Sequence, residues 1–172
     1  VEETGAAQFY RDARIAPIYE GTNGIQAIDL VTRKLPLRGG EVALELLKEI
    51  EATATGAPRE LADMAAPLAA ATAVLRQATR GLLASLSESP GDALAGASPY
   101  LKMFGTVLGG WFHLRSALAA RDLLERGEGD RSFLESRIGL ARFYNRQVLP
   151  TAPGLLEAVL APESDLAASN LV

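Results

Sequence analysis

The chain has 172 residues, of which 48% are hydrophobic and 22% are charged, with 17 basic against 21 acidic residues. This length and balance are typical of a folded domain with its own core, and they argue against a disordered chain. The net charge of -4, without any run of Lys or Arg, argues against nucleic-acid binding and against a membrane-surface role.

The sequence contains no Cys and one His, His113. Disulfides, thiolate catalysis and cysteine-based zinc sites are therefore excluded, and a site with several histidines is impossible. We predict no metal site and interpret His113 as a packed or surface side chain. No charge-free apolar run approaches the ~18 residues of a membrane-spanning helix. The lack of Cys is consistent with a reducing compartment, so we expect a cytoplasmic protein without a membrane span.

Helical periodicity dominates the chain, whereas the alternating patterns of β-strands do not occur. We therefore predict an all-α fold, an antiparallel helical bundle with short connections. The predicted helices span residues 8–14, 23–34, 41–55, 59–86, 98–126 and 131–149, with one more short helix at 153–161.

Proline and glycine mark the connections between these helices. Pro36 ends the second helix, and residues 38–40 form a hinge. Pro67 predicts a kink or a break inside the fourth helix. We expect a loop at residues 87–99 and a loose tail at 163–172.

Apolar residues indicate which face of each helix is buried. The 59–86 helix has a heptad repeat, which is typical of a bundle helix. This repeat consists of Leu61, Met64, Leu68, Ala71, Leu75, Ala78 and Leu82. In the 98–126 helix, the predicted buried face consists of Leu101, Phe104, Leu108, Trp111 and Leu118. In the 23–34 helix, one face carries Ile25, Ile28, Val31 and Leu35.

Five further residues of the long helices have structural interpretations. Gly105, Gly109 and Gly110 lie on one helix and allow a second helix to approach closely. Tyr144 and Asn145 are predicted to make buried hydrogen bonds or an interface contact.

One segment near the amino end carries residues suited to catalysis. Glu20 lies in a predicted loop, between Tyr19 and Gly21, just before the helix that begins at Asn23. A carboxylate whose pKa is tuned by desolvation can act as a general base. Gly21 lets a ligand or a cofactor ring approach the backbone. The free N–H groups of residues 22–24 favour an electron-rich group such as a phosphate or a flavin edge.

The same residues also fit simpler interpretations. Glu20 can be a solvated acid in the first turn of a helix, where the helix dipole favours negative charge. Asn23 and Gln26 have the spacing of a capping box, so Gln26 can serve only to close the helix end. Arg11 and Asp12 can be ordinary surface charges.

Two runs of residues resemble the signature near the carboxyl end of acyl-CoA dehydrogenases. They are Tyr10-Arg11-Asp12-Ala13-Arg14-Ile15 and Ile18-Tyr19-Glu20-Gly21-Thr22-Asn23-Gly24-Ile25-Gln26. The remaining residues, from about Glu41 on, resemble the helical domain that larger members append. The resemblance implies that residues 1–38 end the dehydrogenase's helical domain, that residues 39–162 form the appended bundle, and that residues 163–172 form the tail.

The resemblance also implies a mechanism. Glu20 would remove the α-proton of a fatty acyl-CoA while a hydride leaves the β-carbon for FAD, which gives a trans-2-enoyl-CoA. The substrate would be bound by Tyr19, Glu20 and Gly21. Contacts with FAD would come from Thr22 and Gln26. Ion pairs that brace the loop would come from Arg11, Asp12 and Arg14. The implied partners are an electron-transfer flavoprotein and further copies of the chain in a homo-oligomer.

A second hypothesis treats residues 41–172 as a helical interaction or dimerisation module without chemistry of its own. Both hypotheses can hold together, because they concern different parts of the chain. A relative that acts on another acyl-like substrate fits the first 35 residues equally well.

We predict that this chain alone retains no FAD and oxidises no acyl-CoA. Val1 takes the place of a starting Met, so we expect a piece of a longer protein, and most flavin and substrate contacts of the family come from other parts. Gel filtration after incubation with FAD, followed by a visible absorbance spectrum, measures retention. Stoichiometric yellow flavin in the protein peak would contradict the prediction.

Overall fold

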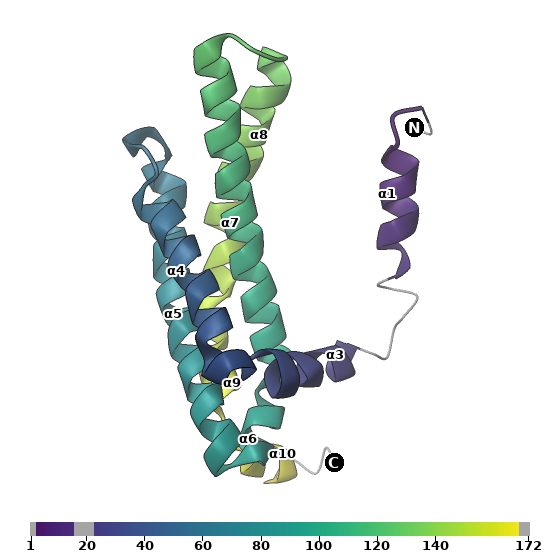
Figure 1. Ribbon diagram of the computed structural model, residues 1–172, viewed down its shortest axis with the longest axis vertical. Helices are drawn as coiled ribbons and strands as arrows, with labels where there is room; N and C mark the ends of the chain where they lie inside the picture. Colours follow the sequence, from purple (N-terminus) through teal and green to yellow (C-terminus); the bar gives the residue numbers. More distant parts are fainter. Residues whose placement is uncertain (1–2, 16–22, 169–172) are drawn as a thin grey trace.

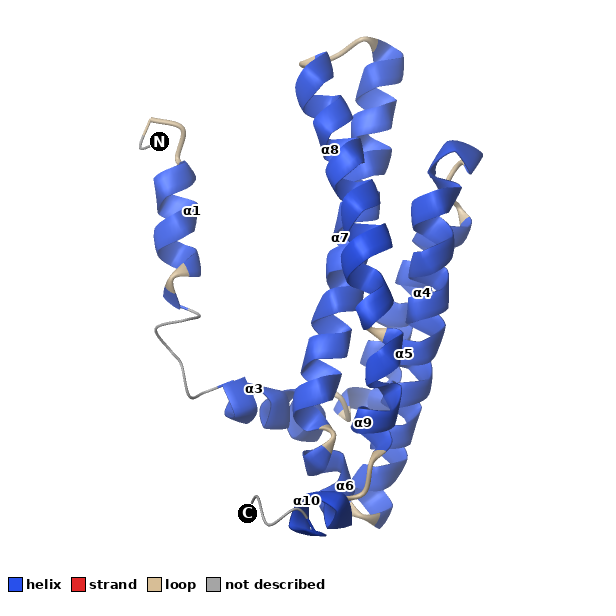
Figure 2. Cartoon of the chain, turned by 180° about the vertical axis from the view of Figure 1, so that it is seen from behind, coloured by secondary structure: helices blue, strands red, loops and turns tan. Residues whose placement is uncertain are grey.

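The computed structural model describes residues 3–15 and 23–168, and all regular structure in these ranges is helical (Figure 2). The predicted all-α fold is therefore confirmed. The α-helices are α1 (Ala6–Ala13), α3 (Asn23–Asp29), α4 (Glu41–Thr55), α5 (Ala62–Glu88), α6 (Pro90–Ala95), α7 (Ala97–Arg126), α8 (Arg131–Phe143), α9 (Leu156–Leu160) and α10 (Glu163–Ala168).

Four long helices, α4, α5, α7 and α8, lie side by side and form the bundle (Figure 1). Successive long helices run in opposite directions, as an antiparallel bundle requires, because the connections between them are short. Helix α3 crosses the bundle beside α7, and α1 stands apart from the other helices. The bundle thus forms the body of the molecule, and α3 joins it to the amino-terminal part.

The heptad repeat predicted for the fourth helix is the face that α5 buries. All seven of its residues are buried in the core, between Leu61 just before the helix and Leu82 near its end. Pro67, however, does not break the helix, which continues through it from Ala62 to Glu88. Pro67 lies in the second turn of α5, close to the start of the helix. Its missing N–H therefore affects only the hydrogen bond to the first turn, and the rest of the helix is unaffected.

Helix α7 buries a different face from the predicted one. Of the predicted stripe only Trp111 is buried, whereas Leu101, Phe104, Leu108 and Leu118 are half-buried at the edge of the core. The buried residues are Ala97, Tyr100, Met103, Val107, Gly110, Trp111, Leu114, Ala117 and Ala120. The prediction was wrong because α7 contacts α3, α4, α5 and α8, so apolar residues surround it and no single stripe stands out.

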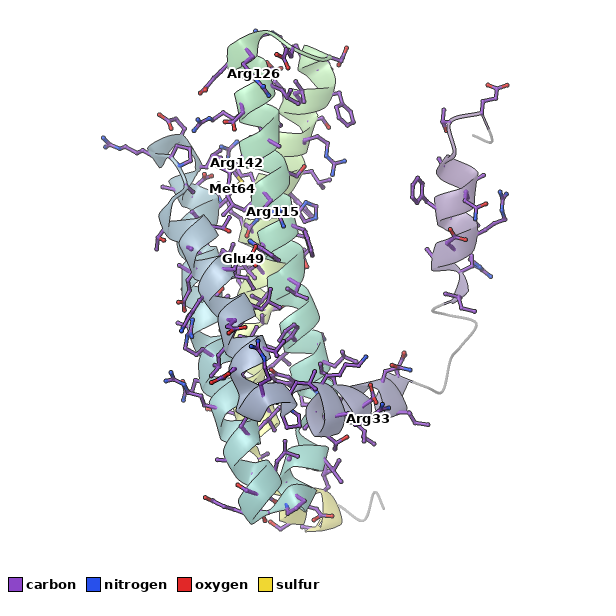
Figure 3. The ribbon with its side chains drawn as sticks, viewed as in Figure 1. Arg33, Glu49, Met64, Arg115, Arg126 and Arg142 are labelled. Carbon is purple, nitrogen blue, oxygen red and sulfur yellow. The ribbon has the colours of Figure 1, made fainter. Side chains whose placement is uncertain are left out.

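Side-chain hydrogen bonds connect the helices across the core. Trp111 Nε1 donates to Thr53 Oγ1 at 2.9 Å and joins α7 to α4. The hydroxyls of Thr79 and Tyr100 lie 2.8 Å apart and join α5 to α7. Nearer the surface, Arg142 Nε donates to Asp63 Oδ2 at 2.6 Å and joins α8 to α5 (Figure 3). These buried polar atoms thus have partners, which avoids the cost of burying them alone. Among the described residues, Asn145 Oδ1 is an exception, since it is buried without a hydrogen-bond partner.

The close approach of α7 and α8 depends on two of the three predicted glycines. A Cβ atom at Gly109 would lie 2.2 Å from the hydroxyl oxygen of Tyr144, and one at Gly110 would lie 3.1 Å from Asn145 Oδ1. Tyr144 donates to Thr106 O at 3.2 Å, and buried Asn145 donates to Ala141 O at 3.0 Å. These contacts confirm the predicted buried hydrogen bonds. Gly105 faces open space instead.

Two predicted irregular segments are helical. Residues 87–99 were expected to form a loop, but α5 extends to Glu88, α6 follows at once, and Gly96 alone separates α6 from α7. Pro90 begins α6, a position where its missing N–H costs nothing. The expected tail contains α10, held to α6 by the Glu163 N–H, which donates to Asp92 Oδ1 at 2.8 Å.

Replacement of Gly96 by Ala should destabilise the fold, because a Cβ atom there would lie 2.1 Å from the backbone oxygen of Val159. We expect a loss of about 1–3 kcal/mol in the free energy of unfolding, measured by urea denaturation. The matched control is Gly139→Ala. Gly139 lies inside α8 with nothing within 4 Å of its Cβ position, so this change should stabilise by about 0.5–1 kcal/mol. Equal effects of the two changes would contradict the role of Gly96.

Candidate functional site

The predicted catalytic segment falls between α1 and α3. Tyr19, Glu20, Gly21 and Thr22 lie outside the described residues, so their assigned roles stay predictions. The structure describes the two helices that flank them, including Gln26.

Helix α1 precedes the segment and carries the charged residues predicted to brace it. Gln8 Nε2 donates to Asp12 Oδ1 at 2.9 Å, and Arg11 Nη2 donates to Gln8 Oε1 at 3.3 Å. The Arg14 guanidinium lies 5.9 Å from the centre of the Tyr10 ring. These contacts stay within α1 and stabilise the helix locally. The proposed bracing of the loop involves residues outside the described ranges and stays a prediction.

Helix α3 (Asn23–Asp29) is the first described element after the segment and lies within the helix predicted for residues 23–34. Gln26 is exposed on its first turn, and among the described residues its side chain makes no hydrogen bond with Asn23. Nothing lies within 4 Å of a Cβ atom built at Gly24. With respect to the described residues, the amide of Gln26 and the space at Gly24 are therefore both open to a ligand at this end of α3.

The buried face of α3 and the turn that follows it matches the predicted one only in part. Ala27 and Val31 are fully buried, and Leu35 is almost so, whereas Ile25 and Ile28 are 63% and 43% exposed. A π-helical turn at Leu30–Lys34 follows α3, and its extra residue per turn shifts which residues face α7, so no single helical stripe runs from Ile25 to Leu35. Ile25 and Ile28 therefore form an apolar surface next to Gln26 that this bundle does not cover.

An apolar groove of about 440 Å³ lies between α4, α7 and the segment that joins α3 to α4, which contains the π-helical turn Leu30–Lys34 and the 3-10 turn Leu37–Gly40. Its lining consists of Leu30, Lys34, Leu35, Leu37, Val42, Ala43, Leu46 and Phe104. The one charged group in the lining is Lys34, whose Nζ lies 3.4 Å from Asp29 Oδ2. The groove suits an apolar group and offers no catalytic side chain. Sequence patterns did not reveal the groove, because its residues come from four helical elements.

His113 packs against Tyr144, with ring centres 4.5 Å apart. Desolvation first and the nearby Arg137 second lower the pKa of His113, which favours the neutral ring at pH 7. Its interpretation as a packed side chain therefore holds.

Within residues 3–15 and 23–168, no three His, Cys, Asp or Glu side chains gather as metal ligands. In those same ranges no helix has the length and hydropathy to cross a membrane.

The sequence of the chain matches a known protein family. The family model described as acetyl-CoA dehydrogenase C-terminal like matches residues 46–169, which include α5 to α10 and most of α4. Together with the relatives below, this match shows that the chain belongs to the acyl-CoA dehydrogenase family.

Three relatives are dehydrogenases of acyl-CoA thioesters by name. The 3-methylmercaptopropionyl-CoA dehydrogenase of Ruegeria pomeroyi is 43% identical over 152 residues, which cover 87% of this chain and 26% of that protein. Butyryl-CoA dehydrogenase of Syntrophomonas wolfei is 31% identical, with 92% and 27% covered. The broad-specificity linear acyl-CoA dehydrogenase FadE5 of Mycobacterium tuberculosis is 30% identical, with 92% and 28% covered. The chain spans about a quarter of the length of these relatives.

Proposed function

We propose that the complete protein is an FAD-dependent dehydrogenase that oxidises an acyl-CoA to a trans-2-enoyl-CoA. The observation that carries the proposal is the likeness to three acyl-CoA dehydrogenases over about nine tenths of this chain. A fatty acyl-CoA is the proposed substrate, and an electron-transfer flavoprotein is the proposed electron acceptor. A homo-oligomer is the proposed assembly.

Glu20 is the proposed base. Its carboxylate removes the α-proton of the thioester, and its backbone N–H holds the thioester carbonyl, which acidifies that proton by stabilising the developing negative charge. Tyr19 and Gly21 line the pocket that binds the acyl group of the substrate. A base of this kind needs a pKa near the working pH, which requires that bound substrate excludes water from the carboxylate.

The start of α3 fits a flavin. Gln26 is exposed, the space at Gly24 is open, and Thr22 comes directly before the helix. Thr22 and Gln26 would hold FAD through their polar side chains, and bound FAD supplies the acceptor for the hydride of the β-carbon. The exposed apolar side chains of Ile25 and Ile28 are also consistent with contact between α3 and the rest of the larger protein.

Replacement of Glu20 by Gln in the complete protein should lower the rate of dehydrogenation by about 10²–10⁴-fold, because Gln cannot accept the α-proton. Flavin content should stay unchanged, since the amide has the size of the carboxylate. Reduction of an artificial electron acceptor measures the rate, and visible absorbance measures FAD.

Glu60→Gln is the matched control, since Glu60 is exposed and has no ion pair within the described part of the chain. This variant should keep the full rate. Loss of activity in both variants, or full activity in Glu20→Gln, would contradict the role of Glu20 as the base.

A second candidate function is assembly through α7 and α8. These two helices expose Phe112, Phe133, Leu140 and Phe143, with 42% to 60% of each side chain accessible. Large exposed apolar side chains on adjacent helices are typical of a surface that another protein covers. This surface supports the interaction module expected for residues 41–172, and it is compatible with the dehydrogenase activity.

Replacement of Phe112 by Glu should lower the oligomer size of the complete protein, because a charge would be buried if another subunit covers α7. Light scattering coupled to gel filtration measures the mass. Leu94→Glu is the matched control on α6, where Leu94 is 43% exposed away from α8. An unchanged mass for Phe112→Glu, or the same loss for Leu94→Glu, would exclude this surface as the interface.

A further inference from the structure

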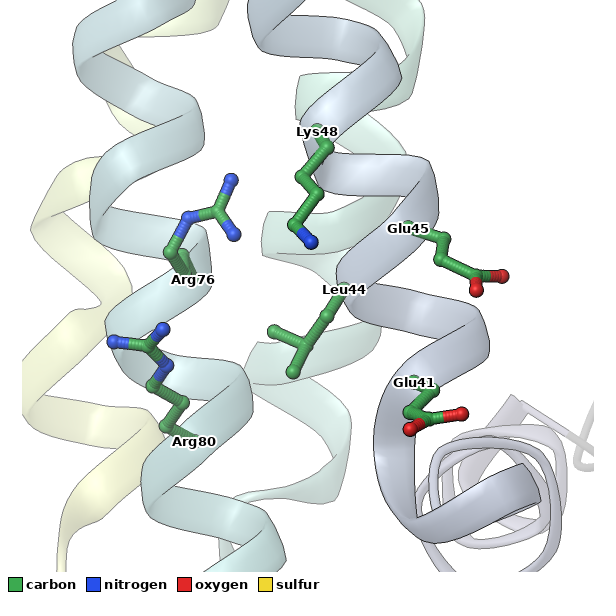
Figure 4. Close-up of a pocket in the computed structure, with 6 residues that line it drawn as sticks. All are labelled: Glu41, Leu44, Glu45, Lys48, Arg76 and Arg80. Atoms are coloured by element: carbon green, nitrogen blue, oxygen red, sulfur yellow. The ribbon is translucent and has the colours of Figure 1, made fainter.

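We propose that a recess between α4 and α5 binds the phosphate group of a small molecule. The recess has a volume of about 280 Å³ and lies between the two helices on the outside of the bundle (Figure 4). Its lining consists of Glu41, Leu44, Glu45, Lys48, Arg76 and Arg80. Its size is close to the lower end of small-molecule sites, which begin at about 300 Å³.

Three cations from two helices meet at this recess. Arg76 projects from α5 toward α4, and Lys48 projects from α4 on the opposite side, whereas the Arg80 side chain extends along α5 at the edge of the recess (Figure 4). Arg76 and Arg80 are one helical turn apart, where like charges repel each other. Lys48 lies on the facing helix and adds to this repulsion. The arrangement is therefore unfavourable unless an anion compensates it.

The carboxylates nearby compensate only part of this charge. Arg76 Nε donates to Glu51 Oε1 at 3.1 Å, and Arg76 Nη2 forms an ion pair with the same oxygen at 2.6 Å. Glu45 points away from the two arginines and pairs with Arg38, with Nη2 and Oε2 2.5 Å apart. Within the described ranges, Lys48 and Arg80 form no ion pair. Glu41 is the remaining carboxylate of the lining, which leaves the recess with excess positive charge.

The donors suit a phosphate better than a carboxylate. The contacts of Arg76 with described residues use Nε and Nη2, so Nη1 remains available to a second anion. Arg76 is held by Glu51 with 17% of its side chain exposed, so its guanidinium is already oriented. Three cationic groups that approach from two sides match the three oxygens and the charge of about -1.5 to -2 of a phosphate monoester. Leu44 offers an apolar wall for the organic part of the ligand.

Calorimetric titration of this 172-residue chain with phenyl phosphate, at constant ionic strength, tests the proposal. We expect saturable binding to one site. Lys48→Gln and Arg80→Gln should each raise the Kd about tenfold, because each removes one charge-assisted hydrogen bond. The double variant should show no measurable binding. Circular dichroism checks that the helix content of each variant is unchanged.

Lys102→Gln is the matched control. Lys102 is an exposed cation on α7 outside the recess, and its loss changes the net charge by the same amount. Its Kd should equal that of the original chain. The proposal is overturned if phenyl phosphate does not bind, if Lys102→Gln weakens binding as much as Arg80→Gln, or if inorganic phosphate binds and the ester does not. Binding of benzoate with the same affinity would overturn the choice of phosphate over carboxylate. These results do not depend on Glu20 or on FAD.

Discussion

The burial of α7 on several sides is the constraint on which the rest of the structure depends. Helices α3, α4, α5 and α8 all pack against it, and full burial of each large apolar side chain contributes about 1.5–3 kcal/mol. The burial of α7 also affects its polar side chains. Burial raises the pKa of Tyr100 to about 12, against the opposite effect of its hydrogen bond with Thr79, so the hydroxyl stays neutral and connects α7 to α5. A helix enclosed in this way can neither slide nor rotate without breaking contacts with several neighbours.

Small residues decide how close the neighbours of α7 can come. Gly109 and Gly110 admit Tyr144 and Asn145 of the π-helical turn that continues α8, and Gly96 admits the backbone at Val159. Close approach increases the contact area between helices and leaves little room for larger side chains. The same packing fixes α3, because Ala27 and Val31 are fully buried in the core. The start of α3, next to the predicted catalytic segment, is thereby held at a defined place on the bundle.

The outer surface of the bundle divides into regions with different chemistry. Ile25 and Ile28 are apolar and lie beside Gln26 at the start of α3. The α7 and α8 surface is aromatic, with arginines over its rings: the Arg115 guanidinium lies 6.0 Å from the centre of the Phe112 ring, and the Arg137 guanidinium lies 5.9 Å from that of Phe133. The recess between α4 and α5 is cationic. Because the three surfaces differ in polarity and charge, each suits a different class of partner.

The sequence by itself determined the helical fold, the buried face of α5 and the family. Each of these rests on local information: a heptad repeat from Leu61 to Leu82, the positions of proline and glycine, and a run of residues around Glu20. The tertiary structure alone decided which side of α7 is buried, why Ile25 and Ile28 are exposed, and that Lys48 meets Arg76 and Arg80. Periodicity identifies a face only when a helix has one apolar side, and α7 has several. Residues far apart in sequence come together only through the antiparallel packing of their helices, which no local pattern encodes.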